Sequence, residues 1–331
     1  MKKYIAIAPI LVLTCFVRQV DAHSKISKQD TTDHSKPTLT LFVPGIITSD
    51  APNNLDAAFT PDGKSVYFVQ ASKDKPSVIT FSKRAGNKWN SPQIAPFSST
   101  ETNDLEPAFD SHGKYLIFAS SRPTTEGGTK IDGHYNGKVY PGMGGNLWKA
   151  ALTKKGWGKA EVLPITINAD SSVFSPAVAG DGSLYFMRAD NGGIFHIYRS
   201  QMNNGTYEAP VQASFTLSDH GDFDPAVAPD ESFIIFSSGR SPAPKTTDLF
   251  ICLRDAKGEW GQPIDLRSVL SDRVFGIEAR LSPDCKTLYF TNSLNASGVK
   301  ISGESFIWQV NISELLKAHG IDKIASKKTT K

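Results

Sequence analysis

Cysteine is scarce in this sequence, and neither sign of charge is in large excess. The three cysteines match no zinc-ligand spacing, so neither a disulfide framework nor a Cys/His zinc module is expected, and Cys252 and Cys285 are expected to be unpaired. The formal net charge of +3 is too small to attract the chain to nucleic acid or to an anionic membrane. No phosphate-binding glycine loop and no Ser-His-Asp order occurs, so the sequence predicts no cofactor, no metal and no nucleic-acid partner.

Long apolar runs are also missing, with one short exception at the N-terminus. Two lysines precede an apolar stretch over residues 4–17, and small residues around Ala22 suit the cleavage site of a signal peptide. The stretch is shorter than the ~20 residues that a membrane span requires. We therefore expect a cleaved signal peptide over residues 1–22 and a periplasmic or secreted protein. A membrane anchor and a lipid on Cys15 are the alternatives.

The main feature of the sequence is a motif that occurs five times. Each copy opens with an acid or a serine, continues as a short apolar run, turns at a Pro-Asp-Gly-like sequence and ends in a second apolar run, as a β-hairpin does. The opening residues are Asp56, Glu106, Ser175, Asp224 and Glu278. Successive copies lie about 50 residues apart, apart from an excess of roughly twenty residues after the second copy, and such a period indicates a propeller.

Two further strand signals follow each of the first four hairpins and complete units of four strands, and one signal follows the fifth hairpin. The third signal falls at 78–81, 146–149, 195–198, 248–251 and 305–310, and the fourth at 93–95, 161–163, 211–213 and 264–266. The fifth unit lacks its own fourth strand, whereas residues 38–43 have strand character and no neighbouring partner. If this N-terminal strand completes the last sheet, the ring closes and its exposed edges disappear.

The fold class that follows is all-β: a five-bladed β-propeller with four antiparallel strands per blade, the last blade closed by the N-terminal strand. The propeller is expected over residues 38–312. A flexible polar leader over 23–37 would precede it, and a short helix with a basic tail over 313–331 would follow it.

Three elements of the repeat carry a family resemblance. They are Asp224-Pro-Ala-Val, Ser282-Pro-Asp-Cys-Lys followed by Leu288-Tyr-Phe, and the Ser-x-Arg sequences at Ser120–Arg122 and Ser238–Arg240. They resemble the repeats of TolB-like (WD40-like) β-propellers over roughly residues 39–310. The resemblance implies the propeller fold and a class that includes periplasmic proteins linked to peptidoglycan-binding domains. It implies no particular activity, because propellers host binding, scaffolding and catalysis alike.

The opening acids form a candidate channel ring, because the first strand of each blade is expected to line the central channel. The ring and its basic neighbours contain Asp56, Glu106, Asp224, Glu278, Arg122, Arg188, Arg240 and Arg280. Crowded carboxylates repel one another, so each needs a basic neighbour, a proton or a cation. We favour a structural role in which the acids pair with arginines or cap backbone amides. A polar ligand or cation site and a catalytic acid pair are the alternatives.

The excess residues of the second unit, Pro123–Gly145, form a candidate recognition loop. The segment is rich in glycine and lacks the apolar alternation of a further blade, so an inserted loop is predicted. It contains His134, Tyr135 and Tyr140, and the two tyrosines could stack on a sugar or a peptide. A surface excursion without function fits the pattern equally well.

These patterns predict an exported TolB-like propeller that binds a ligand or protein partner without chemistry, with an envelope protein or a glycan as the expected partner. The rival hypothesis is a secreted carbohydrate-active enzyme of the glycoside hydrolase type, with paired carboxylates at the channel mouth. The geometry of the four acids discriminates between the two. Acids that face one another across an empty pocket would favour the enzyme, and acids held by arginines or backbone amides would favour the binding protein.

Overall fold

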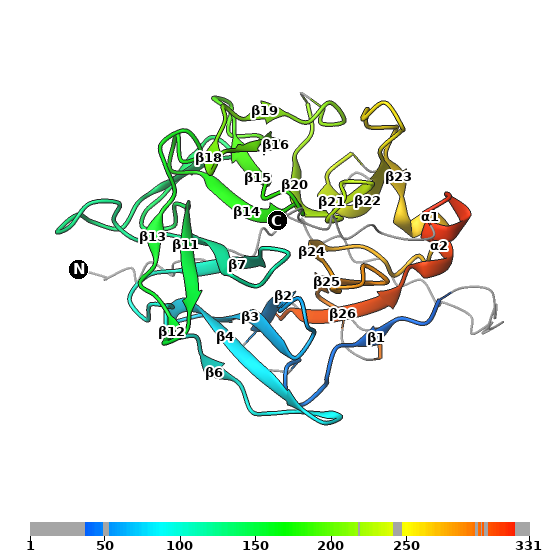
Figure 1. The fold of residues 1–331 in the computed structure, drawn as a ribbon, viewed down its shortest axis with the longest axis horizontal. Coiled ribbons are helices and arrows are strands. Elements are labelled where there is room, and N and C mark those ends of the chain that lie inside the picture. The colour runs from blue at the N-terminus through cyan, green and yellow to red at the C-terminus, as the bar shows by residue number, and fades with distance from the viewer. Residues whose placement is uncertain are drawn as a thin grey trace, which may run out of the picture.

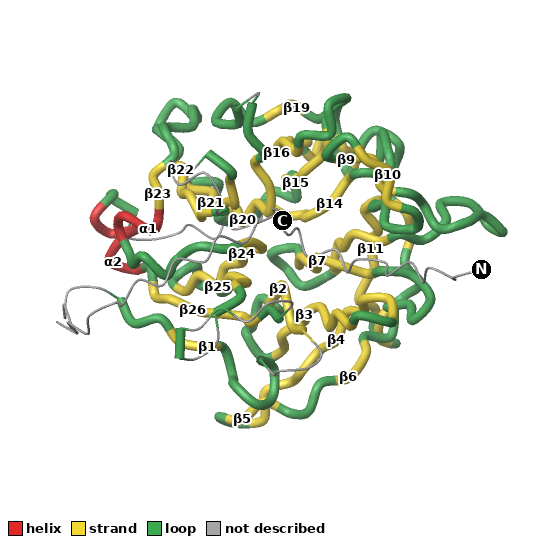
Figure 2. The backbone as a smooth tube through the Cα atoms, turned by 180° about the vertical axis from the view of Figure 1, so that it is seen from behind, coloured by secondary structure: helices red, strands yellow, loops and turns green. Residues whose placement is uncertain are grey.

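The computed structural model describes residues 37–48, 53–217, 219–240, 247–294, 297–298, 300 and 304–321. The expected signal peptide and most of the expected leader lie outside these residues. The described chain is a five-bladed β-propeller, as predicted, and its innermost strands surround one axis (Figure 1). The view from behind shows the same ring, with loops at its periphery (Figure 2). No helix within the described ranges is long and apolar enough to cross a membrane.

Each blade is an antiparallel sheet of four strands that runs outward from the axis. Blade 1 contains β2 (Asn53–Phe59), β3 (Ser65–Ser72), β4 (Lys75–Ala85) and β6 (Gln93–Ile94), with β5 (Lys88–Trp89) paired to the end of β4. Blade 2 contains β7 (Asp104–Phe109), β8 (Tyr115–Ser120), β11 (Asn146–Thr153) and β13 (Glu161–Val162), with β12 (Gly156–Trp157) at the end of β11. Blade 3 contains β14 (Val173–Val178), β15 (Leu184–Ala189), β16 (Phe195–Ser200) and β19 (Val211–Gln212), and β17 (Met202–Asn203) pairs with β18 (Thr206–Tyr207) beside it.

The last two blades follow the same plan, with two short helices at their outer edge. Blade 4 contains β20 (Asp222–Val227), β21 (Phe233–Ser238), β22 (Asp248–Leu253) and β23 (Ile264–Asp265), and α1 (Leu266–Val269) follows it. Blade 5 contains β24 (Ile277–Leu281), β25 (Thr287–Asn292), β26 (Phe306–Asn311) and the N-terminal strand β1 (Thr40–Leu41), and α2 (Ser313–Ala318) follows β26. The predicted closure is therefore present.

The closing strand is shorter than predicted, but the residue after it is firmly packed. Thr40 pairs with Gln309 and Leu41 with Trp308. The Phe42 amide then donates to the carbonyl of Ile307 at 2.8 Å, after which the chain turns through Val43 at a positive φ of 45°. Phe42 is 5% exposed. The closure of the propeller thus depends on the buried side chain of Phe42 as well as on strand pairing.

The core consists of five apolar clusters, one at each interface between neighbouring blades. The phenylalanine that ends the repeated Tyr-Phe or similar pair anchors each cluster from the second strand of its blade. These residues are Phe68, Phe118, Phe186, Phe236 and Phe290, each at most 1% exposed. The repeat in the sequence is therefore a repeat of inter-blade packing. Cys252 and Cys285 are buried and unpaired, as expected, and burial raises the pKa of both thiols to about 12.

The inserted segment of blade 2 is more ordered than the prediction of a loop implied. It forms a hairpin of its own from β9 (Gly133–Tyr135) and β10 (Lys138–Tyr140). Tyr135 is only 2% exposed, because its ring stacks on Tyr140 at 4.3 Å between centroids and packs against Phe195 of blade 3 at 5.4 Å. The two tyrosines therefore stack on each other, and this packing leaves Tyr135 buried.

Candidate functional site

All five opening residues occupy one unusual backbone position. Each innermost strand carries a β-bulge there, and the register against the second strand shifts across it. Asp56, Glu106, Ser175, Asp224 and Glu278 have φ values of 58°, 56°, 46°, 52° and 59°, in the left-handed region that residues other than glycine seldom adopt. Such a conformation costs on the order of 1–3 kcal/mol per residue and persists only where surrounding contacts impose it. A bulge also redirects the side chain, here toward the axis.

The redirected side chains link blades 2, 3, 4 and 5 in sequence around the channel. Glu106 Oε2 accepts a hydrogen bond from the Ser175 amide at 2.6 Å, and the Ser175 hydroxyl donates to Asp224 Oδ1 at 2.6 Å. Asp224 Oδ2 then accepts from the Glu278 amide at 2.9 Å. The structure thus brings the predicted ring of acids together and occupies Glu106 and Asp224 with backbone donors of the neighbouring blade.

One of the four candidate arginines also reaches this ring. Arg280 Nη2 lies 2.8 Å from Asp56 Oδ1, and the two side chains are 7% and 1% exposed. The pair joins blade 5 to blade 1, where the chain closes the propeller. Breaking a buried ion pair by removing one partner typically costs about 3–5 kcal/mol. Loss of either partner should therefore destabilise the contact between the first and last blades.

The other three arginines have partners outside the ring, which corrects the predicted grouping. Arg122 pairs with Asp104 and Arg240 with Asp222, each at 2.6 Å between nitrogen and oxygen. These aspartates lie two residues before the ring acids Glu106 and Asp224, at the start of the innermost strand of their blade. Each pairs with the last residue of the second strand, Ser120 or Ser238, and the arginine follows two residues after that serine. Arg188 lies over the ring of Tyr198 at 4.2 Å, with Asp170 at 3.9 Å.

A sequence signal for these pairs was available and was missed. Among the five repeats, an aspartate occurs two residues before the opening acid only in the second and fourth. Those are the two repeats that contain Ser-x-Arg after the second apolar run. The co-occurrence of Asp104 with Arg122, and of Asp222 with Arg240, therefore predicts the ion pairs that the structure contains.

Burial raises the pKa of three ring acids, Asp56, Glu106 and Glu278. Desolvation, opposed in part by Arg280, raises the pKa of Asp56 to about 7. Desolvation and then the charges of Asp56 and Asp224 raise the pKa of Glu106 to about 8. The same two causes raise the pKa of Glu278 well above its ordinary value. Near neutral pH the ring therefore holds protons, which reduces the repulsion between its carboxylates.

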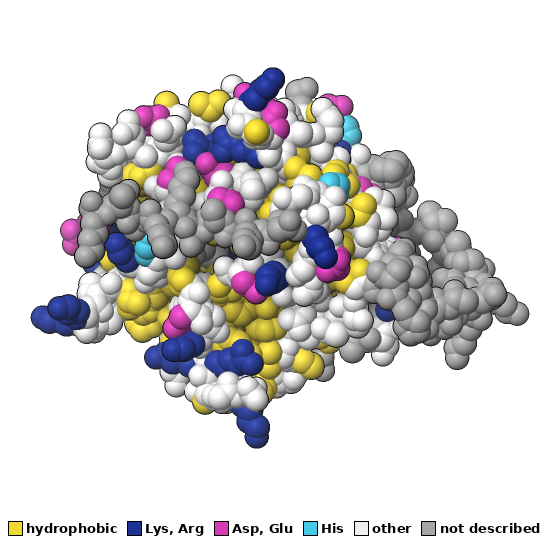
Figure 3. Space-filling view, turned by 45° about the vertical axis from the view of Figure 1, so that its right-hand side comes forward, with side chains coloured by type: hydrophobic (Ala, Val, Ile, Leu, Met, Phe, Trp, Pro, Cys, Tyr) yellow, Lys and Arg dark blue, Asp and Glu magenta, His cyan; other side chains and the backbone are white. Residues whose placement is uncertain are grey.

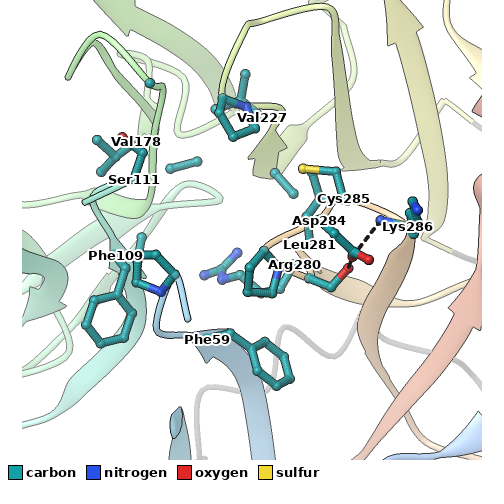
Figure 4. A pocket seen from close by; sticks show the side chains of 18 of the residues that line it. Phe59, Phe109, Ser111, Val178, Val227, Arg280, Leu281, Asp284, Cys285 and Lys286 are labelled. Atoms are coloured by element: carbon teal, nitrogen blue, oxygen red, sulfur yellow. Dashed lines mark hydrogen bonds between the residues drawn. The ribbon is translucent and has the colours of Figure 1, made fainter. Parts of the chain in front are cut away.

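A cavity of about 940 Å³, called the funnel from here on, opens at the end of the channel next to the hairpin turns (Figure 4). All five blades contribute their innermost strands and first turns to it, and α2 lines one side. Its walls are mainly apolar and include Pro176, Val178, Val227 and Leu281. Arg280 reaches from β24 toward the middle of this space. None of the four ring acids lines the funnel.

A smaller cavity of about 490 Å³ adjoins the funnel at the seam between blades 1 and 5. The two cavities share Phe59, Pro61, Pro283 and Asp284, so apolar surface continues from the axis toward the rim. Trp89, with Arg84 6.0 Å from its ring, lies farther out. Apolar patches bordered by basic and acidic side chains are visible on the face in Figure 3.

The predicted recognition loop takes no part in the funnel. Neither His134 nor the stacked pair Tyr135 and Tyr140 lines it. The backbone amide of His134 donates a hydrogen bond to the Ser172 hydroxyl at 2.9 Å, which fixes the insert to blade 3. Within the described residues, no group of three or more His, Cys, Asp or Glu side chains could hold a metal ion.

Comparisons with known proteins identify the fold and no more. No protein-family model and no curated protein sequence matches the chain. A thermostable family-43 glycoside hydrolase is similar in structure, with a TM-score of 0.52, 13% sequence identity, and 81% of this chain and 90% of that chain covered. TolB from Acinetobacter baumannii has a TM-score of 0.47 at 16% identity, with 78% of this chain covered. This chain spans about half of that TolB chain, 54% of its length. A Trypanosoma rangeli sialidase has a TM-score of 0.44 at 15% identity, with 79% of this chain and 47% of the sialidase covered.

Proposed function

We propose that the protein is a β-propeller binding module whose ligand enters the funnel and undergoes no reaction there. The observation that carries the proposal is the funnel itself: about 940 Å³, mainly apolar walls from five blades and two buried charged groups, Asp110 and Arg280, among them. Small-molecule sites are concave and mostly apolar, with a few fixed polar groups, and typically measure about 300–1,000 Å³. The funnel has each of these properties.

The rival function, glycoside hydrolysis, has less support. Glycosidases need two carboxyl groups on either side of a sugar, about 5–10 Å apart, with access to the glycosidic bond. In this protein the ring acids do not line the funnel, and Glu106 and Asp224 accept hydrogen bonds from backbone amides. Sugar hydroxyls also need polar partners, and polar side chains such as Ser111, Ser282 and Asp284 are fewer than apolar ones among the residues that line the funnel. An apolar ligand or a segment of an envelope protein suits these walls better than a glycan.

Occupancy of the funnel is tested with Nile red, a neutral dye whose fluorescence rises in apolar surroundings. The half-buried Val178 lines the funnel, so Val178→Trp should fill part of it and weaken dye binding by about tenfold or more. Val211, in the outermost strand of the same blade, is 70% exposed, so Val211→Trp is the matched control and should bind as the wild type does. Equal binding by both variants would place the dye elsewhere and contradict the proposal.

The enzyme hypothesis has a separate assay. The purified protein is incubated with a panel of glycans, and reducing ends are measured. The proposal predicts no release above that of a Glu106→Gln, Asp224→Asn double variant. Turnover by the wild type that both substitutions abolish would establish the rival function.

We also propose that the protein acts in the periplasm or outside the cell, on the basis of the N-terminal sequence. Expressed in a bacterial host with its own N-terminus, it should be recovered from the periplasm or medium with His23 as its first residue. Intact-mass measurement gives the result directly. The variant Ala22→Trp should keep the N-terminal segment, because a bulky residue blocks cleavage. A full-length cytoplasmic product, or a lipid on Cys15, would contradict the prediction.

A further inference from the structure

We propose that the ligand of the funnel is an apolar monocarboxylate whose carboxylate binds the Arg280 guanidinium while its apolar body lies along the walls. This inference rests on the proposed function, because it names the chemical class that the same cavity accepts. Its basis is the incomplete bonding of Arg280 and the composition of the walls around it.

Arg280 is 5% exposed, yet its hydrogen bonds are far from complete. Nη1 donates to the Ala279 carbonyl at 2.8 Å, and Nη2 lies 2.8 Å from Asp56 Oδ1. Nε has no hydrogen-bond partner among the described residues, although a guanidinium carries five N–H donors. Unsatisfied donors on a buried charge are unfavourable, and a carboxylate satisfies two of them at once through parallel hydrogen bonds. A carboxylate in the funnel would therefore complete the bonding of Arg280.

The walls specify the rest of the ligand. Pro176, Pro225, Val178, Val227 and Leu281 offer apolar surface and no side-chain hydrogen-bond donor or acceptor. A ligand covered in hydroxyl groups would lose hydration there without compensation, whereas a hydrocarbon chain or aromatic body gains from burial. An amine at the inner end would be repelled by Arg280. One anionic end and an apolar body is the combination that matches both parts of the cavity.

Other charged groups around Arg280 make binding depend on pH. Asp56, Glu106, Asp224 and Glu278 lie on the ring side, and the charged or titratable side chains that line the funnel besides Arg280 are Asp110, His112, Asp284, Cys285, Lys286, Glu314 and Lys317. Ionised Asp56 competes with a ligand carboxylate for Arg280, and protonated Asp56 does not. Because burial raises the pKa of Asp56 to about 7, affinity should fall as the pH rises from about 6 to about 8.5, a range over which the ligand carboxylate stays ionised.

The test compares three probes that share one hydrocarbon chain: octanoate, octanol and octylammonium. Displacement of Nile red from the wild-type protein is measured at about pH 6.5. Octanoate should bind roughly 10- to 100-fold more tightly than octanol, as expected for charge-assisted hydrogen bonds, and octylammonium should bind more weakly than octanol. Equal binding of octanoate and octanol would overturn the carboxylate assignment while the funnel remains a binding site. Failure of all three probes to displace bound dye would overturn it as well.

Variants assign the effect to Arg280. Arg280→Gln alone leaves Asp56 without its partner and could unfold the protein, so it is combined with Asp56→Asn, which removes both charges and keeps similar shapes. The double variant should lose the preference for octanoate over octanol and still bind Nile red. Arg280→Lys should retain part of the preference, because the charge remains and the planar fork is lost. A double variant that keeps the full preference would overturn the inference. Failure of Nile red to bind the wild type would instead mark failure of the proposed function.

Discussion

Deletion of residues 38–44 should destabilise the protein by at least about 4 kcal/mol and cause aggregation, because it removes β1 and the buried ring of Phe42. The Phe42 ring lies 5.0 Å from that of Tyr289 and 5.5 Å from that of Phe59, so the deletion opens a cavity at the seam between blades 5 and 1. It also exposes the edge of β26 to pairing with other chains. Urea unfolding monitored by tryptophan fluorescence measures the loss.

Two single substitutions isolate the part of this effect that comes from the packing of Phe42, since both keep the backbone pairing of β1. Phe42→Ala should cost about 3–5 kcal/mol through the cavity that it leaves. Thr40→Ala, at an exposed position of β1, should change stability by about 0.5 kcal/mol or less. A deletion variant that unfolds at the same urea concentration as the full chain would contradict closure of the ring by the N-terminal strand.

The second large effect concerns the pH dependence of stability, which the channel ring should dominate. Glu106 has an ordinary pKa of 4.5, and burial raises it to about 8 in the folded protein. Between these two values the folded state keeps a proton that the unfolded state releases, so stability falls as the pH rises through this window and levels off above it. Across this window the free energy of unfolding falls by roughly 3–5 kcal/mol through Glu106 alone, at about 1.4 kcal/mol per pH unit.

Glu106→Gln should remove this loss, because its amide oxygen can still accept from the Ser175 amide and it never ionises. The variant should be more stable than the wild type at about pH 8.5 and nearly equal to it at about pH 5. Glu101→Gln, at an exposed position just before the same strand, is the control and should leave the profile unchanged. Parallel stability curves for Glu106→Gln and the wild type would show that Glu106 is ionised in the folded state.

The propeller could be predicted from the sequence because its repeat records the packing between blades. The phenylalanines of the five second strands, from Phe68 to Phe290, each fill an equivalent interface between blades. The same residue type therefore recurs at equivalent positions of the sequence repeat. The partnerless segment over 38–43 indicated the closure for a related reason, since a blade with three strands needs a fourth.

The candidate site was less predictable, because its geometry depends on backbone details that the pattern does not contain. A strand without bulges would place the acid and the residue two positions earlier on the same face. The bulge separates them, so Glu106 points to the channel ring and Asp104 pairs with Arg122. The incomplete bonding of Arg280 could not be anticipated either, since it depends on where Asp56 of the first blade lies after the ring has closed.

The most direct test of the account is a Nile red titration of Glu106→Gln and Val178→Trp beside the wild-type protein. We assign ligand binding to the funnel walls and a structural role to the ring acids. We therefore predict that Glu106→Gln binds the dye as the wild type does and that Val178→Trp binds it about tenfold or more weakly. The reverse result, with binding lost in Glu106→Gln and retained in Val178→Trp, would contradict it and move the functional site to the ring.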